Sequence, residues 1–175
     1  MQRVVIIGTA GSGKSHLGER LAPLIGAPLI ELDALFWLPG WTHQPFDEFW
    51  HLVNNATAAP RWVVVGNFTI VRDITWRRAD TMIWLDYPLG LVMRRLLRRT
   101  IRRIRSQEEL WGTGNRESWR KSFADRESIL LWALKTWKKN RETFEQALAL
   151  PVHQHLVQHR FRDPYDTEAW FAAQR

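Results

Sequence analysis

Five short apolar segments alternate along the chain with longer stretches in which apolar residues recur every three or four positions. Three of these segments are nearly continuous in Val, Ile, Leu or Trp, which is typical of parallel strands covered on both faces. The alternation predicts β-α-β units and an α/β fold built on an open parallel sheet. The predicted strands are Arg3–Gly8, Pro28–Asp33, Arg61–Gly66, Thr81–Asp86 and Val152–His159.

The stretches between the strands have helical spacing. A last long helix is expected to begin near Ser122, three residues before Asp125, a spacing typical of a helix start. The earlier predicted helices are Leu17–Ile25, Pro45–Ala58 and Pro88–Ile104. In the third of these, the predicted apolar stripe consists of Leu97, Ile101 and Ile104.

The turn after the first strand, from Gly8 to Ser15, fits G-x-x-x-x-G-K-[ST], the pattern of a phosphate-binding P-loop. Its glycines let the backbone aim successive N–H groups at one anion, and the following helix adds its positive dipole end. We expect Lys14 to reach the β- and γ-phosphates and the Ser15 hydroxyl to ligate Mg²⁺. The residues expected to hold the nucleotide are Gly8, Thr9, Ala10, Gly11, Ser12, Gly13, Lys14, Ser15 and His16. ATP is the expected nucleotide, because the chain has no Asn-Lys-x-Asp run of the kind that reads guanine.

Two aspartates end predicted strands, and ligands of open α/β sheets bind at the carboxyl ends of strands. Asp33 would orient Mg²⁺ through water or accept the proton of an acceptor hydroxyl; the alternative is a helix N-cap. Asp86 closes an apolar strand as a Walker-B aspartate does and would ligate Mg²⁺; the alternative is a turn aspartate.

The segment after the third strand holds candidate acceptor-binding residues. Gly66 would let a ligand approach the backbone closely, and Asn67 would hydrogen-bond the acceptor. Arg72 would pair with a phosphate or carboxylate of the acceptor. The alternatives are a turn asparagine and a surface arginine. We expect the segment Leu35–Trp41 and the helix that follows it to shape the acceptor pocket, with Asp33 and Trp37 among the substrate-binding residues.

Seven arginines lie between Arg94 and Arg105, and no acidic residue falls between Tyr87 and Gln107. Like charges at i, i+4 spacing cost helix stability unless anions or acids face them. Three interpretations stay open: a lid that brings guanidiniums to a transferring phosphoryl group, a nucleic-acid surface, or a solvated face. The like-charged rows are Arg94, Arg98, Arg102 and Arg95, Arg99, Arg103.

Composition narrows the class of protein. The chain has 175 residues, a formal charge of +7 and no cysteine, which excludes disulfides and thiolate metal sites and suits a reducing cytoplasm. No signal peptide and no apolar run of membrane-spanning length is found, so a soluble single domain is expected. The eleven tryptophans are expected to pack in the core rather than stack on bases. His153, His155 and His159 are expected on one face of an edge strand; a metal site there is the alternative.

The P-loop and several other segments together resemble the small bacterial P-loop proteins described as topology modulation proteins, which are similar to adenylate kinase and to shikimate- and gluconate-type kinases. The other segments are 32–35, 39–41, 66–68, 71–73, 78–81, 84–86, the arginine helix and 114–117. The resemblance implies a P-loop NTPase fold with a five-stranded parallel sheet flanked by helices and a helical lid. It implies an acceptor-binding flap at 34–60 and an arginine-rich lid at 94–122. It places Arg72 where nucleoside-monophosphate kinases hold the acceptor phosphate, and Arg116 and Arg120 in the lid.

Two residues depart from the family pattern: Val65 stands where an aspartate is usual, and Phe36 where a histidine is common. If that aspartate orients Mg²⁺, this protein uses Asp33 or Asp86 instead, or catalyses weakly.

The sequence thus predicts an ATP- and Mg²⁺-dependent phosphotransferase acting on a small acceptor, such as a nucleotide, nucleoside or similar metabolite. The lid arginines predicted to stabilise the transferring phosphoryl group are Arg98, Arg102 and Arg116. The alternatives are a nucleotide-regulated nucleic-acid-binding protein and a catalytically weak ATP-binding relative.

Overall fold

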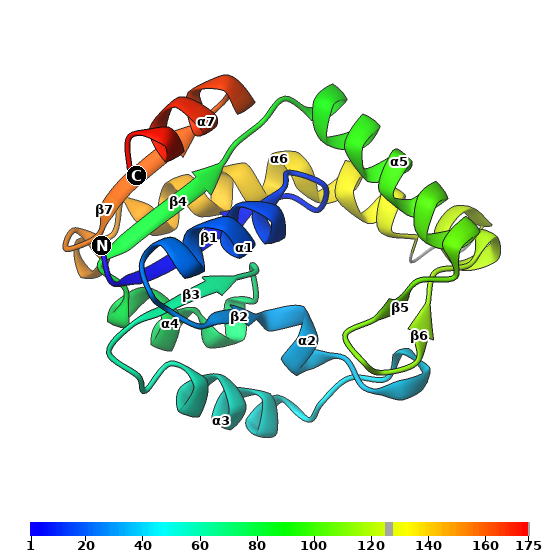
Figure 1. Ribbon diagram of the computed structural model, residues 1–175, viewed down its shortest axis with the longest axis horizontal. Helices are drawn as coiled ribbons and strands as arrows, with labels where there is room; N and C mark the ends of the chain where they lie inside the picture. The colour runs from blue at the N-terminus through cyan, green and yellow to red at the C-terminus, as the bar shows by residue number, and fades with distance from the viewer. Residues whose placement is uncertain (125–127, 175) are drawn as a thin grey trace.

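The computed structural model of the protein describes residues 1–124 and 128–174. Its centre is a five-stranded sheet in the order β2-β3-β1-β4-β7, in which every neighbouring pair is parallel. The first strand therefore lies in the middle, and the turn that follows it opens at the carboxyl edge of the sheet (Figure 1). The strands are β1 (Arg3–Gly8), β2 (Leu29–Glu31), β3 (Trp62–Val65), β4 (Thr81–Leu85) and β7 (Val157–Phe161).

The three central strands are buried almost throughout, as their continuous apolar sequences predict. In register, Val5 of β1 lies beside Val64 of β3 and Met82 of β4, and all three side chains pack in the same hydrophobic core on one face of the sheet. Each strand is followed by a helix, which is what places the strand ends and the helix starts at one edge.

Helices cover both faces of the sheet and create two hydrophobic cores (Figure 1). Phe49 of α3, Trp76 of α4 and Phe144 of α6 share one core. Leu17 of α1 and Val92 of α5 share the other with α7. The helices are α1 (Lys14–Leu24), α2 (Leu32–Phe36), α3 (Phe46–Ala56), α4 (Arg72–Arg78), α5 (Leu89–Ser106), α6 (Ile129–Leu148) and α7 (Pro164–Ala172). In the described part of the chain, no helix is both long and apolar enough to cross a membrane.

A small antiparallel hairpin of β5 (Glu109–Leu110) and β6 (Asn115–Arg116) joins the end of α5 to the segment before α6. It reaches toward the segment that follows α2 (Figure 1). The sequence does not predict this hairpin, because two-residue strands are too short to show a period of two.

The prediction for the last strand is wrong at its start. β7 begins at Val157, and Pro151–His153 forms a short 3₁₀ helix instead. His153 is buried there, with Nδ1 bonded to the Ala147 carbonyl at 2.7 Å, so the three histidines do not share one strand face. The proline at Pro151 favours this helical turn over a strand.

Two helix predictions also need correction. In α5 the buried residues are Val92, Leu96, Thr100 and Ile104, whereas Leu97 is 40% exposed. The last long helix begins at Ile129, where the Ser128 hydroxyl accepts from the N–H of Leu131. The predicted start at Ser122 lies in a π-helical turn, Arg120–Ala124, and its partner Asp125 lies outside the described residues.

Candidate active site

The P-loop has a backbone that only glycines can form without strain. Gly8, Gly11 and Gly13 have φ angles of 150°, 85° and 99°. A Cβ at Gly8 would lie 2.7 Å from the Leu85 carbonyl oxygen, and one at Gly11 would lie 2.8 Å from that of Val92. The glycines therefore allow the loop to lie directly against the end of β4 and the start of α5.

Lys14 begins α1 and folds back over the loop. Its Nζ donates to the carbonyl oxygens of Gly8 at 2.7 Å and Thr9 at 3.1 Å. Burial lowers the pKa of Lys14 to about 8, against an opposing effect of the Asp33 carboxylate. The ammonium is thus held in a desolvated place, where an incoming phosphate would stabilise its charge strongly.

The lowered pKa of Lys14 predicts a pH-dependent nucleotide affinity. Above pH 8 the free protein loses the Lys14 charge, so each further pH unit is expected to weaken ATP binding by up to about tenfold. Below about pH 7 the lysine is protonated and this dependence should vanish. Calorimetric titration of ATP between pH 7 and 9.5 measures the effect, with Lys14→Arg as the matched control, since arginine stays charged and should give a flat profile. A flat profile for the unchanged protein would show that Lys14 does not contact the phosphates.

Asp33 lies in the first turn of α2, beside Lys14. Glu31 occupies the N-cap position of this helix, so the capping interpretation of Asp33 is not supported. Burial raises the pKa of Asp33, although Lys14, Arg99 and a hydrogen bond from Trp37 favour its charged form. A carboxylate with a raised pKa next to a lysine is suited to accept a proton from a bound hydroxyl.

Asn67 and Gly66 have structural contacts that their predicted roles did not include. The Asn67 side chain brackets Gly8: Oδ1 accepts from the Gly8 N–H at 3.2 Å, and Nδ2 donates to the Gly8 carbonyl. Gly66 has a φ of 143°, and a Cβ there would lie 2.8 Å from Cβ of Leu32. Both residues therefore position the P-loop and the β2–α2 junction. Val65 packs in the core on the α1 side and is 3% exposed, so its side chain is not at a metal-binding position.

Arg72 is half-buried at the start of α4. Its guanidinium carbon lies 4.6 Å from the ring centre of Trp76 and 5.9 Å from that of Phe144. Burial lowers the pKa of Arg72, and no carboxylate among residues 1–124 and 128–174 forms an ion pair with it. A desolvated guanidinium without an acid is suited to an anionic ligand.

The arginine helix presents a different row to the P-loop than the one predicted. Arg95 donates from Nη1 to the Ser12 carbonyl at 3.3 Å, and its guanidinium lies over the Tyr87 ring. Arg99 acts electrostatically on both Lys14 and Asp33, and burial lowers its pKa. The Arg99 Nε is buried without a hydrogen-bond partner among the described residues.

The predicted lid arginines lie elsewhere. Arg98 is exposed, and Arg102 is 71% exposed with an ion pair to Glu108 at 3.8 Å. Arg116 in β6 and Arg120 in the following turn are exposed as well. The reason is helical geometry. At 100° per residue, Arg98 and Arg102 lie about 180° and about 140° from the centre of the buried stripe, whereas Arg99 lies about 80° from it. The sequence contained a signal for this orientation, because Leu96, Thr100 and Ile104 also form a helical stripe. They fit that spacing as well as the predicted stripe of Leu97, Ile101 and Ile104.

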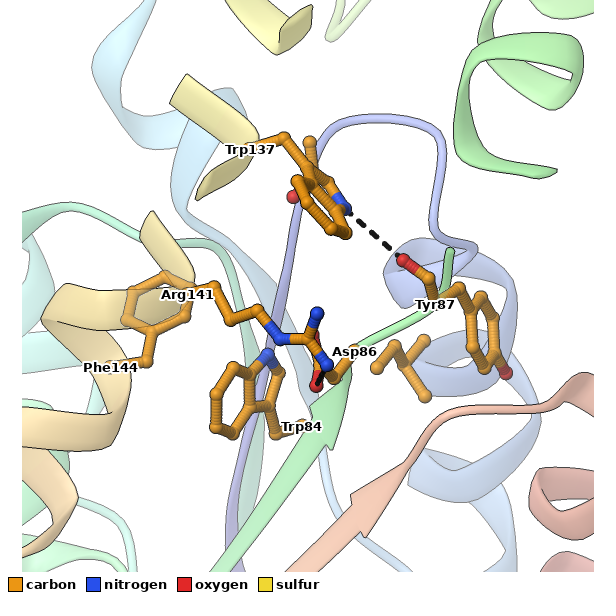
Figure 2. A pocket seen from close by; sticks show the side chains of 8 residues that line it. Trp84, Asp86, Tyr87, Trp137, Arg141 and Phe144 are labelled. Atoms are coloured by element: carbon orange, nitrogen blue, oxygen red, sulfur yellow. Dashed lines mark hydrogen bonds and ion pairs between the residues drawn. The ribbon is translucent and has the colours of Figure 1, made fainter. Parts of the chain in front are cut away.

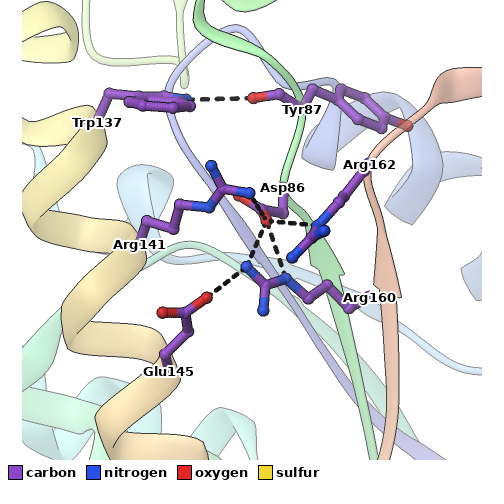
Figure 3. A network of polar contacts seen from close by, with 7 residues as sticks. All are labelled: Asp86, Tyr87, Trp137, Arg141, Glu145, Arg160 and Arg162. Atoms are coloured by element: carbon purple, nitrogen blue, oxygen red, sulfur yellow. Dashed lines mark hydrogen bonds and ion pairs between the residues drawn. The ribbon is translucent and has the colours of Figure 1, made fainter.

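The Asp86 carboxylate forms ion pairs with arginines. Figure 3 shows three guanidiniums converging on this buried carboxylate, one from α6, one from β7 and one from the residue just after β7, and Glu145 contacting one of them. Arg160 donates to Oδ2 at 2.7 Å, Arg141 at 2.9 Å, and Arg162 lies at 3.6 Å. The carboxylate therefore anchors α6 and the end of β7 to the end of β4, and its arginine partners compensate for the burial of its charge.

Beside Asp86 lies a cavity of about 10 Å³, enough for roughly one water molecule. Thr9 of the P-loop, Trp84 and Phe144 line it, and the Trp137 indole N–H closes it with a 3.2 Å bond to the Tyr87 carbonyl (Figure 2). The cavity is too small for an acceptor and belongs to the packing beneath the P-loop.

The predicted flap and the predicted lid touch through Asn115, which is 3% exposed. Its Oδ1 accepts from the Trp41 N–H at 2.9 Å, and its Nδ2 donates to the Leu38 carbonyl at 2.8 Å. Trp41 and Trp111 meet edge to face, and both have positive φ angles, 62° and 56°. Bulky residues rarely adopt this conformation, so the two turns are shaped for this contact.

The donors present fit a nucleotide with Mg²⁺. Ser12 Oγ is buried in the P-loop without a partner among the described residues. Ser15 is exposed in the first turn of α1, and Asp33 supplies a carboxylate nearby. Mg²⁺ is commonly held by one or two protein oxygens together with substrate phosphates, so this sparse set is sufficient. In the described residues, no group of three His, Cys, Asp or Glu side chains forms a separate metal site.

Comparisons with known proteins agree with this geometry at the level of the fold. No family model matches the chain, and no curated protein matches its sequence. Three solved structures match as follows. A gluconokinase from Sinorhizobium meliloti is 20% identical, covering 95% of this chain and 86% of its own, with a TM-score of 0.51. A shikimate kinase from Acinetobacter baumannii, in complex with shikimate, is 14% identical; the match covers 100% of this chain and 95% of that kinase, with a TM-score of 0.57. A shikimate kinase from Bacteroides thetaiotaomicron is 16% identical; the match covers 98% of this chain and 95% of that kinase, with a TM-score of 0.52.

These matches and the sheet order confirm the P-loop NTPase fold with a five-stranded parallel sheet flanked by helices. They support the resemblance to small P-loop kinases at the level of the fold. The narrower resemblance to topology modulation proteins stays a prediction.

Proposed function

We propose that this protein is an ATP-dependent phosphotransferase that moves the γ-phosphoryl group to a hydroxyl of a small, anionic acceptor. The observation that carries the proposal is the convergence of Lys14, Asp33 and Arg99 at the P-loop, in a place where burial shifts the pKa of all three groups. Two cations beside a proton acceptor, over a loop of phosphate-binding N–H groups, are the components that phosphoryl transfer needs.

Each residue has a distinct task in the proposed reaction. The P-loop N–H groups and Lys14 bind the β- and γ-phosphates, and Arg95 and Arg99 stabilise charge on the transferring group. Asp33 takes the proton of the acceptor hydroxyl while the hydroxyl oxygen bonds to the γ-phosphorus. The bond between the γ-phosphorus and the oxygen that bridges it to the β-phosphate breaks, and ADP leaves. Mg²⁺, held by Ser15 with Asp33 through water, would neutralise phosphate charge.

The acceptor is inferred to be anionic because of Arg72. This half-buried guanidinium has no acidic partner in the described residues, and its stacking on Trp76 orients it. A carboxylate or phosphate of the acceptor would supply the missing counter-charge. We assign the segments 34–60 and 94–122 as flap and lid around this acceptor, with Trp37 contacting it beside Asp33. The gluconokinase and shikimate kinase neighbours are named for acceptors of this kind.

The test is ADP production from Mg·ATP with paired acceptors that differ only in the anionic group. Suitable pairs are gluconate with glucose and a nucleoside monophosphate with its nucleoside. Stimulation by one anionic member, and not by its neutral partner, is the expected result. Stimulation by neutral members alone would overturn the role of Arg72. Tight ATP binding without turnover for any acceptor would support the catalytically weak relative instead.

A further inference from the structure

The outer face of α5 carries arginines that the proposed reaction does not use. Arg94, Arg98, Arg102 and Arg105 are exposed, whereas Arg95, Arg99 and Arg103 face the P-loop or the acids of the hairpin segment. The helix therefore divides its seven arginines into an inner row with contacts and an outer row facing solvent. We call the four exposed arginines the outer row.

The outer row has almost no counter-charge. Arg102 has one long ion pair to Glu108, at 3.8 Å. Arg94, Arg98 and Arg105 form no ion pair with any side chain that the structure describes. Like charges at this spacing destabilise a helix, so the row carries a cost that an external anion would relieve.

The geometry of the row is regular. At 100° per residue its four side chains fall within an arc of about 80°, and at 1.5 Å per residue they extend over about 17 Å. One strand of a nucleic-acid duplex presents about five phosphates over that length. All four residues are arginines, whose planar fork matches a phosphate better than the point charge of lysine does.

Other polyanionic surfaces fit the row less well. A helix that lies in a membrane interface inserts its apolar face into the lipid. In α5 that face, with Leu96 and Ile104, is already buried against the rest of the protein. An acidic protein segment carries carboxylates at spacings that its own sequence sets, whereas a duplex backbone repeats its phosphates about every 3.4 Å along each strand.

From these observations we propose that the outer row binds the phosphate backbone of double-stranded nucleic acid, without reading its sequence. The contacts would lie on the opposite side of α5 from the P-loop, so this surface is separate from the proposed phosphotransfer site. The proposal does not depend on kinase activity, and binding is measured without turnover.

The test measures how the affinity for a duplex depends on salt concentration. The probe is a labelled DNA duplex of about 20 base pairs, followed by fluorescence anisotropy between about 50 and 200 mM salt. The variant Arg94→Gln/Arg98→Gln/Arg105→Gln should bind at least about tenfold more weakly at 100 mM salt. Its plot of log K against log salt should be less steep by about 2.7, or 0.9 for each lost phosphate contact.

The matched control is Arg3→Gln/Arg61→Gln/Arg77→Gln, which removes the same charge from exposed residues at the opposite, amino-terminal edge of the sheet. It should keep the steep salt dependence. Thermal unfolding of the outer-row variant should show an unchanged or higher Tm, since repulsion is relieved. Equal losses in both variants, no duplex binding at 50 mM salt, or binding to anionic vesicles in place of the duplex would each overturn the proposal.

Discussion

Replacing Lys14 with alanine is expected to lower kcat for ATP turnover by about 100- to 1000-fold, the usual cost of removing one preorganised donor from a developing anion. The Lys14 ammonium lies over the P-loop, bonded to the Gly8 and Thr9 carbonyls, and is the cation best placed to move onto a γ-phosphate. Its loss also removes a charge that favours the ionised form of Asp33, so the pKa of that carboxyl should rise further and a smaller share of it should be ionised at neutral pH. Steady-state kinetics with the best acceptor measure the effect.

Lys139→Ala is the matched control, because Lys139 is an exposed lysine on α6. It should retain full turnover. Thermal unfolding should show that the Lys14 variant is folded, since the substitution removes a desolvated charge rather than a core side chain. Turnover within a few-fold of the unchanged protein would remove the P-loop from the reaction.

Arg99→Ala and Arg98→Ala, although adjacent in sequence, are expected to differ by about 100-fold in kcat. Arg99 faces Lys14 and Asp33 with its Nε buried and unpaired, so it is available to the transferring phosphoryl group. Arg98 is exposed on the outer face of α5. The Arg99 variant should lose kcat more than it changes the KM for ATP, because its contact would strengthen as charge develops.

Measuring both variants in parallel controls for helix stability, since each removes one arginine from the same turn of α5. Comparable kcat values, or a larger loss for Arg98→Ala, would show that the lid rotates or closes differently from the arrangement described. In that case the sequence-based choice of Arg98 and Arg102 would be the better one.

Local sequence was enough for the elements whose signal is local. The three central strands are long apolar runs, and they are buried as predicted because a parallel strand covered on both faces needs no alternation. The last strand was misplaced because Val152 and Leu156 are isolated apolar residues in a mostly polar segment, and a 3₁₀ turn that begins at Pro151 accommodates Val152 as well as a strand would. The β5–β6 hairpin is stabilised by side chains distant in sequence, such as Asn115 on Leu38, and no local pattern reports such a contact.

In the candidate site too, local sequence predicts some positions and tertiary contacts decide others. The position of Lys14 over a glycine-rich turn follows from residues that are neighbours in the chain. The partners of Asp86 do not, because Arg141 and Arg160 come from α6 and β7 and meet the aspartate only when both pack against β4. The local sequence around a strand-end aspartate is the same whether the carboxylate binds a metal ion or pairs with arginines.

By itself, the sequence determined the glycine-rich turn after β1 and the parallel α/β fold, and it predicted phosphate binding at that turn, because glycine conformations and apolar periodicity act over a few residues. Only the tertiary structure decided which arginines face the P-loop, that Asn67 and Gly66 support it, and that Asp86 is neutralised by arginines. The physical reason is that the orientation of a helix is set by what it packs against: with seven arginines and two competing apolar stripes, α5 could be assigned a face only once Leu96 and Thr100 were seen to be buried.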